Sequence, residues 1–285
     1  MMPRHFSQQP GFLWLLLLSV VAGLSTIGCN ATPPPATDNL ENNTNQSTTA
    51  PTATTTITVS AAASLQDALE TIATDFQAAA PDIQVEYNFG SSGSLQRQIE
   101  QGAPVDVFFS AAATQMDTLA AKDLIVPATR RDVVANSLVL IAPQTSTLVI
   151  QDLSELATTP FQYFAVGEFR SVPAGQYAQE AFEKLDLLEP LQAKFVFGSS
   201  VRNVLSAVSS GNAELGIVYA TDAVLADQVK VLLTVPEDLH QPIRYPIAIL
   251  KNSTHPEASQ VFIDFLQEDT TQQTFAEFGF VPLSN

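Results

Sequence analysis

The sequence is poor in the side chains on which most catalytic and metal centres depend. Its 285 residues include one cysteine and three histidines, and 12 Lys and Arg face 29 Asp and Glu. A single cysteine excludes a disulfide within the chain. The formal charge of −17 argues against nucleic acid as a partner, because such binding needs clustered Lys and Arg to displace counterions. It argues equally against electrostatic adhesion to an anionic membrane surface.

Enzyme motifs are also missing from the sequence. There is no Walker lysine and no G-x-G-x-x-G, and His5 precedes an apolar leader. His240 in "EDLHQP" and His255 in "STHPEA" are expected in solvent-exposed loops. The sequence therefore offers few histidines and cysteines from which a Ser/His/Asp triad or a metal cluster could be built. We expect no catalytic residue, no direct metal-cation ligand and no cofactor.

The N-terminal region reads as an export signal followed by a tether. The apolar run "FLWLLLLSVVAGL" is too short for a comfortable membrane span, so residues 1–28 are interpreted as a signal peptide. Cys29 follows a glycine where a bacterial lipoprotein is cleaved and acylated, although Thr26 replaces the usual leucine. A plain cleaved signal is the alternative. Residues 29–56, rich in Thr, Asn and Pro, are expected to form a disordered tether.

The remaining body, from residue 57 to 285, alternates short apolar strands with helical stretches. "ITVSAA", "IQVEYNF", "VDVFFSA", "FAVGE" and "KFVFGS" are typical of strands, and amphipathic segments such as "SLQDALETIATDFQAAA" follow them. This alternation predicts an α/β fold with mainly parallel sheets that helices cover on both faces. In such folds ligands bind beyond the carboxyl ends of the strands, near helix starts.

Small and hydroxyl-bearing residues occupy four of these strand-to-helix turns. Ser64 follows the first strand, Ser92 in "GSSGS" the second, Ala174 lies in "VPAG", and Val201 follows "KFVFGSS". Each helix start offers unpaired N–H groups and the positive end of a helix dipole, which suits an anion without any lysine. For each serine alone the plainer interpretation is capping. Ser64 with Asp67 reads as a capping box, and Ser92 or Ser94 as an ordinary N-cap.

The motifs, taken together and in order, resemble the molybdate-binding proteins of ABC transporters. The resemblance is carried by "ITVSAAASLQDAL", "GSSGSLQRQIEQGAPVDVFFSA", "RRDVVANSLVLIAP", "SVPAGQYAQEAF", "VRNVLSAV", "GIVYATDA" and "FAEFGF". It covers nearly all of residues 57–285. It implies a type II periplasmic-binding-protein fold, in which two lobes close on a tetrahedral oxyanion held in the cleft between them.

The resemblance also implies a ligand set and a domain plan. Ser64 and Ser92 would each give a hydroxyl and a backbone N–H, Ala174 and Val201 a backbone N–H, and Tyr219 its phenolic hydroxyl. From the residues alone, Tyr219 is an ordinary half-buried aromatic at a strand end. Gly93 departs from members with a serine there and is expected to loosen the turn slightly. Lobe 1 is expected at 57–136 plus 240–285 and lobe 2 at 137–239, with hinges near 136–137 and in 233–243.

The function that follows is extracytoplasmic capture of molybdate, and of tungstate as well, for delivery to the permease of an ABC transporter. We expect an exported monomer that faces the periplasm or the cell exterior and meets the membrane through a lipid anchor at Cys29. The nearest alternative is a binding protein for sulfate or another tetrahedral oxyanion. A secreted hydrolase that uses Ser64 or Ser92, and a sensory or adhesive lipoprotein, are the alternatives from other classes.

Overall fold

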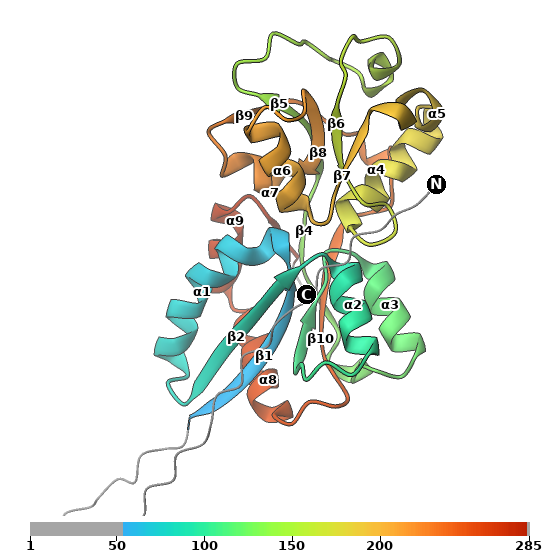
Figure 1. Ribbon diagram of the computed structural model, residues 1–285. Helices are drawn as coiled ribbons and strands as arrows, with labels where there is room; N and C mark the ends of the chain where they lie inside the picture. Colours follow the sequence, from blue (N-terminus) through green and yellow to red (C-terminus); the bar gives the residue numbers. More distant parts are fainter. Residues whose placement is uncertain (1–53, 284–285) are drawn as a thin grey trace, which may run out of the picture. The chain divides into compact units, whose positions relative to one another are not determined.

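The first apolar segment of the body forms an internal, largely buried strand. The computed structural model describes residues 54–283 (Figure 1), all within one compact unit. The predicted signal peptide, Cys29 and most of the tether lie outside this range. Strand β1 (Thr55–Ala62) pairs in parallel with β2 (Ile83–Gly90) from its first residue. Residues 55 and 56 therefore belong to the sheet and not to the tether, because backbone pairing does not require apolar side chains.

The first sheet has six strands in the order β11-β4-β10-β3-β1-β2. The pairings of β1 with β2 and β3 are parallel, while β10 is antiparallel to β3 and β4, and β11 to β4. Four of the strands thus run in one direction and two in the other. The further strands are β3 (Val107–Phe109), β4 (Arg131–Ala135), β10 (Arg244–Ile249) and β11 (Val281–Pro282).

The second sheet has five strands in the order β7-β6-β8-β5-β9. Strand β6 is parallel to β7 and β8, whereas β5 is antiparallel to β8 and β9. Only β5 therefore runs against the other four. These strands are β5 (Leu138–Pro143), β6 (Phe164–Gly167), β7 (Phe195–Gly198), β8 (Leu215–Tyr219) and β9 (Val229–Thr234).

Helices cover both faces of the first sheet, as Figure 1 shows. Helix α1 buries Leu69, Ile72 and Phe76, which recur at helical spacing. The ring of Phe76 meets that of Phe262 edge to face at 5.2 Å between centroids. On the opposite face a separate apolar cluster includes Leu95 and Met116. The helices are α1 (Gln66–Ala79), α2 (Ser92–Glu100), α3 (Ala113–Ala121), α8 (Pro256–Phe265) and α9 (Asp269–Glu277).

The second sheet is likewise flanked by helices (Figure 1). They are α4 (Pro173–Lys184), α5 (Leu188–Leu191), α6 (Val201–Ser209) and α7 (Ala220–Val224). Five short 3₁₀ turns complete the described elements, at Ala63–Leu65, Pro127–Thr129, Leu153–Ala157, Gln192–Lys194 and Glu237–Leu239. Among the described residues, no helix is long and apolar enough to cross a membrane.

The chain passes between the two sheets twice. It leaves the first sheet after β4 and enters the second with β5, so residues 136 and 137 form the first crossing. It returns between β9 and β10, over residues 235–243. The sequence pattern did not reveal β4, because exposed Arg131 and Asp132 leave only Val133 and Val134 as a buried apolar pair. Both crossings coincide with positions where hinges are predicted, and hinge motion itself stays a prediction.

Candidate functional site

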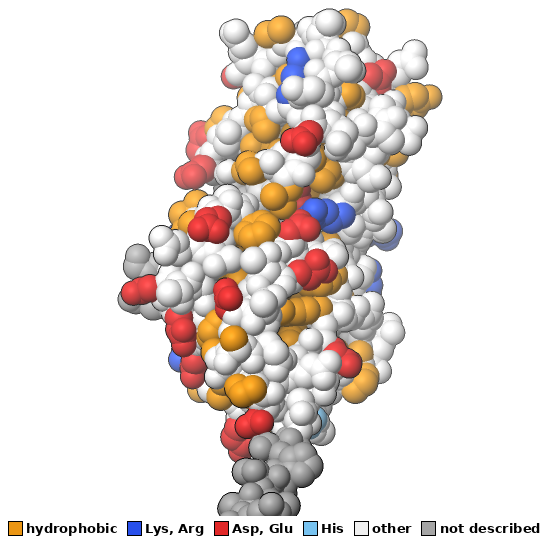
Figure 2. Space-filling model, turned by 90° about the vertical axis from the view of Figure 1, so that its left-hand side faces the viewer, with side chains coloured by type: hydrophobic (Ala, Val, Ile, Leu, Met, Phe, Trp, Pro, Cys, Tyr) orange, Lys and Arg blue, Asp and Glu red, His pale blue; other side chains and the backbone are white. Residues whose placement is uncertain are grey.

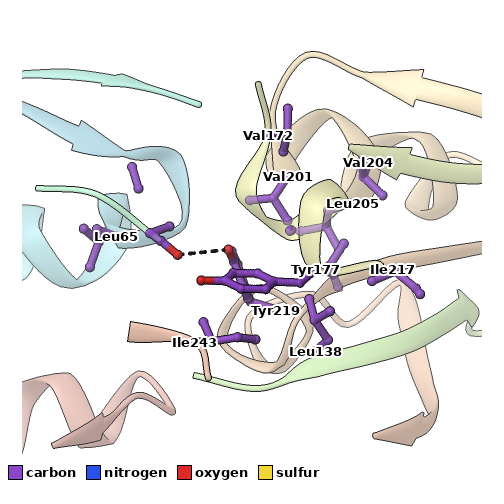
Figure 3. Packing of buried hydrophobic residues seen from close by; sticks show 14 of the residues in the cluster. Leu65, Leu138, Val172, Tyr177, Val201, Val204, Leu205, Ile217, Tyr219 and Ile243 are labelled. Carbon is purple, nitrogen blue, oxygen red and sulfur yellow. Dashed lines mark hydrogen bonds between the residues drawn. The ribbon is translucent and has the colours of Figure 1, made fainter. Parts of the chain in front are cut away.

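Four strand-to-helix turns, two from each sheet, line one small cavity. The cavity is narrow and partly open to solvent. In Figure 3, Val172, Val201 and Tyr219 from the side of the second sheet face Leu65 from the first. Twelve residues line the cavity: Ala62, Ala63, Ser64, Gly90, Ser91, Ser92, Ala111, Val172, Pro173, Ala174, Val201 and Tyr219. All five residues predicted to bind an anion are therefore brought together.

Ser64 lies in the 3₁₀ turn that joins β1 to α1 and is 4% exposed. The capping box predicted for Ser64 and Asp67 does not form, because the helix proper begins only at Gln66 and no side chain caps it. The Ser64 hydroxyl instead lies 3.0 Å from the Tyr245 hydroxyl. Asp67 pairs with Arg202. Ser64 is thus free of a capping role and faces the cavity.

Ser92 is the first residue of α2, and Ser91 is its N-cap. The predicted capping role of Ser92 is therefore wrong. Its hydroxyl is fully buried and accepts a hydrogen bond of 2.9 Å from the backbone N–H of Ala111. The neighbouring Gly93 does not loosen the turn, contrary to expectation. Its N–H donates to the Ser171 carbonyl at 3.0 Å, and a Cβ at this position would stand 2.6 Å from that oxygen.

Ala174 and Val201 contribute backbone from the second sheet. Ala174 is the second residue of α4, after Pro173, and Val201 is the first residue of α6. N–H groups at such positions have no acceptor within the helix. Ser200 caps α6 by accepting from the N–H of Asn203, which leaves the Val201 N–H for another acceptor. Both residues are buried, so these amides depend on a partner in the cavity.

Tyr219 ends β8 and is 1% exposed, which is more buried than the sequence predicts. Its hydroxyl donates a long hydrogen bond of 3.4 Å to the Ala111 carbonyl (Figure 3). Burial raises the pKa of Tyr219 well above its ordinary value, so the phenol keeps its proton. The hydroxyl therefore remains a donor at every physiological pH.

The cavity wall contains no Lys, Arg, His, Asp or Glu among the described residues. Its polar groups are hydroxyls and main-chain atoms of helix starts. Figure 2 shows acidic side chains scattered over one face of the molecule, with few basic groups between them. Within residues 54–283 no group of three or more His, Cys, Asp or Glu could hold a metal ion. The wall thus suits an anion that is bound by dipoles and not by counter-charge.

Neither described histidine reaches the cavity. His240 is 6% exposed, so the predicted solvent-exposed position is wrong; its ring packs against that of Tyr177 at 5.7 Å between centroids. His255 is partly exposed, as predicted, and lies near Thr254 and Asp106. Ser64 and Ser92 consequently lack the base that a serine nucleophile needs.

An ion cluster joins the two sheets beside the cavity. Arg202 of α6 pairs with Asp67 of α1, and its Nε lies 2.9 Å from Oδ1 of Asp222. Asp222 is fully buried, and this burial raises the pKa of its carboxyl to about 7, although Arg202 favours the charged form. Together with the bond between Gly93 and Ser171, this cluster fastens the first sheet to the second.

Sequence reasoning missed two residues that shape the cavity. Ala111 follows β3 at the same edge as the predicted turns, and the rule for the carboxyl ends of parallel strands could have found it. Tyr245 gave no such signal, because β10 is antiparallel to β3. Its amino end, not its carboxyl end, lies on the side of the cavity, where Tyr245 contacts Ser64 behind the wall.

Comparison with known proteins places this arrangement among transport proteins. Residues 57–281 match the family model described as bacterial extracellular solute-binding protein. The chain is 40% identical over 230 residues to the molybdate-binding protein ModA of Escherichia coli, covering 79% of this chain and 88% of that protein. It is 39% identical over 236 residues to YvgL of Bacillus subtilis, whose name describes a substrate-binding lipoprotein, covering 83% and 90%.

A solved structure supports the fold. The periplasmic molybdate-binding protein of Azotobacter vinelandii superposes with a TM-score of 0.72 at 24% identity, over 80% of this chain and 100% of that one. The predicted two-lobed periplasmic-binding-protein fold is thereby confirmed.

The buried carboxyl of Asp222 predicts a pH dependence of stability. A carboxyl that titrates near 7 when folded, and near 4 when unfolded, stabilises the fold fully below about pH 4 and progressively less as the pH rises to about 7. The Asp222→Asn variant lacks this titration. Between about pH 4 and pH 7 the wild type should therefore lose about 2–4 kcal/mol of unfolding free energy that the variant does not lose. Urea unfolding of both proteins at each pH measures this difference.

The matched control is Asp227→Asn, because Asp227 is an exposed aspartate in the loop after α7. Its stability should follow the wild-type pH profile. Parallel profiles for wild type and Asp222→Asn would contradict the prediction.

Proposed function

Since this chain belongs to the bacterial extracellular solute-binding proteins, we propose that it captures molybdate in the cavity between its two sheets and delivers it to the permease of an ABC transporter. It is a binding protein and not an enzyme. The proposal depends above all on one observation: the polar lining of the cavity consists of hydroxyls and main-chain groups, with no charged side chain. The ModA relatives, named for molybdate, support the choice of ligand.

The donor set favours an oxyanion that carries no proton. Main-chain N–H groups can only donate, and a buried proton on the ligand would need an acceptor. Molybdate, tungstate and sulfate are fully deprotonated at neutral pH, whereas phosphate retains a proton. About seven charge-assisted hydrogen bonds, at roughly 1.5–3 kcal/mol each, offset the desolvation of such a dianion. A dissociation constant between about 1 μM and 1 nM is expected.

The contacts between the sheets support capture by closure. Gly93 bonds to Ser171, and Asp67 pairs with Arg202, so the cavity wall is assembled only when the sheets approach. We place the hinges at residues 136–137 and 235–243, with 57–136 plus 240–285 moving against 137–239. Opening there would separate Ser64 and Ser92 from Ala174, Val201 and Tyr219, and release the anion.

Sulfate is the second candidate ligand, because the same donors suit it. The sulfate-binding protein SubI of Mycobacterium tuberculosis shares the fold, with a TM-score of 0.72 at 17% identity. Fold likeness at this identity does not select the anion.

The first test compares anions by thermal unfolding of the purified protein. Molybdate and tungstate, each at about a hundredfold excess over the dissociation constant, should stabilise by about 2.7 kcal/mol. This corresponds to a rise of roughly 5–10 °C in the unfolding midpoint. Sulfate and phosphate at the same concentration should raise it far less. A shift with sulfate as large as that with molybdate would overturn the choice of ligand, and no shift with any anion would overturn the site.

Ser92→Ala tests the residues of the site. Loss of one charge-assisted hydrogen bond should raise the dissociation constant for molybdate about 10- to 100-fold, measured by calorimetric titration. Ser94→Ala is the matched control, because the Ser94 hydroxyl bonds to Ser91 and Arg97 and does not line the cavity. Its affinity should stay close to wild type. Equal losses in the two variants would show that the turn matters and the Ser92 hydroxyl does not.

We further propose that Cys29 is acylated and anchors the protein outside the cytoplasmic membrane. Support comes from the apolar run that ends shortly before Cys29 and from the lipoprotein name of the relative YvgL. In a bacterial expression host, the wild-type protein should sediment with membranes, and Cys29→Ser should be recovered in the soluble exported fraction. Soluble recovery of both would leave a plain cleaved signal as the explanation.

A further inference from the structure

The start of α2 gives one of its amide groups to the other sheet. Ser91 is the N-cap, so the N–H groups of Ser92 and Gly93 have no acceptor within the helix. Ser92 lines the cavity, whereas Gly93 does not. The N–H of Gly93 donates instead to the carbonyl of Ser171, 3.0 Å away in the turn before α4. This amide thus joins the two sheets and is not left for the anion.

The bond between Gly93 and Ser171 differs in kind from the other contacts between the sheets. The ion pairs beside the cavity are formed by side chains, as is the hydrogen bond of 2.9 Å from Gln115 Nε2 to Gln176 Oε1. Long side chains can follow a change in the spacing of the sheets by adopting other rotamers. In the bond between Gly93 and Ser171 both groups belong to the main chain. This contact therefore depends directly on the distance between two backbones.

The Ser171 carbonyl belongs to a turn that is held from two sides. The N–H groups of Ser171 and Val172 both donate to the carbonyl of Glu168, at 3.1 and 2.9 Å. Behind this turn, α4 packs directly onto the end of β6, where a Cβ on Gly175 would collide with the Gly167 carbonyl. The turn therefore has little room to retreat when α2 approaches it.

The backbone around Gly93 is held as firmly. The N–H of Leu95 donates to the Ser91 carbonyl at 3.0 Å, and the Leu95 side chain is buried in the apolar cluster beneath α2. The hydroxyl of Ser92 accepts from the N–H of Ala111 at 2.9 Å. Two backbones that are both held in this way cannot move past the point at which they touch.

We propose that the contact between Gly93 and Ser171 is the stop at which closure of the two sheets ends. This stop then sets the width of the cavity between Ser92 and Ala174, which both line it. The inference rests on the proposed function. Ser92 is bonded directly to Gly93, and Ala174 follows Ser171 by three residues at the start of α4. The width of the cavity therefore follows the spacing of the two backbones at this contact.

The position of the stop requires a glycine. A Cβ at position 93 would stand 2.6 Å from the oxygen of Ser171 and 2.7 Å from its Cα. Non-bonded heavy atoms settle at about 3.5 Å or more, so a side chain at this position would keep the backbones roughly 1 Å farther apart. Gly93 is not among the glycines with a positive φ. The requirement therefore comes from the space at Ser171 and not from the conformation of the helix start.

Gly93→Ala tests the inference. Alanine favours a helix more than glycine does, so the thermal midpoint of the protein without ligand should stay equal or rise. The affinity for molybdate, measured by calorimetric titration, should nevertheless fall about 10- to 100-fold. The reason is that closure would end early, so the donors of the two sheets would not reach the anion together.

The width of the cavity supplies a second measurement, which a merely structural role of Gly93 would not change. Sulfate is a smaller dianion than molybdate, so a cavity held open should lose more of its contacts with sulfate. In displacement titrations of Gly93→Ala, the ratio of molybdate affinity to sulfate affinity should therefore rise about 3- to 10-fold.

Ser171→Ala is the matched control, because it changes the same contact without touching the main chain. The hydroxyl of Ser171 bonds to Glu168 Oε2 at 2.7 Å, within its own turn, and the carbonyl that meets Gly93 remains in the variant. Its affinity for molybdate and its ratio of molybdate to sulfate affinity should both stay close to wild type.

The outcomes separate the inference from the proposed function. If Gly93→Ala binds molybdate as tightly as wild type, or leaves the affinity ratio unchanged, closure does not end at this contact and the inference is overturned. It is also overturned if Ser171→Ala loses as much affinity as Gly93→Ala. If wild type binds sulfate and not molybdate, the choice of ligand fails, while the sulfate affinities of the same variants still decide the inference. If wild type binds no anion, the site and the inference fail together.

Discussion

A cavity lined by hydroxyls and main-chain groups, with no charged side chain, is the constraint on which the proposed binding depends. The cavity has no charged side chain in its wall, so the partial charges of several helix starts have to point at one place. No single sheet supplies enough of them. Ser64 and Ser92 belong to the first sheet, and Ala174 and Val201 lie at helix starts of the second. The proposed binding of the anion therefore requires both sheets to be together.

The contacts outside the cavity are suited to such an event. Gly93 can meet the Ser171 carbonyl because it has no side chain, and a Cβ would stand 2.6 Å from that oxygen. Arg202 reaches across to Asp67 and also lies against Asp222. Burial disfavours the charged form of the Asp222 carboxyl. The ion pairs of Arg202 therefore stabilise the contact between the two sheets less than their opposite charges alone would suggest. For the proposed closure, contacts of moderate strength would allow the ligand to shift the balance between open and closed forms.

A side-chain hydrogen-bond network lies where the chain passes between the sheets. Asn136 stands between β4 and β5, and it donates both to Thr221 beside the second sheet and to Tyr245 in the first. The hydrogen-bond network that includes Tyr245 and Ser64 thus draws on both sheets. Closure of the two sheets, as proposed, would therefore affect the hydrogen bonds of Ser64.

The sequence was sufficient to predict the class of fold and the strand-to-helix turns that meet at the cavity. Strands such as β1 and helices such as α1 can be predicted because the spacing of their own apolar residues indicates the type of element. Small residues at the starts of α2 and α6 indicate the edge of the sheets at which ligands bind in such folds. The sequence did not predict the hydrogen-bond partners of Ser64 and Ser92, the burial of His240 or the position of Tyr245. Each of these features depends on tertiary packing or on the direction of β10. Local sequence patterns hold no information about either. A single hydroxyl in the sequence is donor and acceptor alike; its role is set by which neighbours the folded chain places around its oxygen.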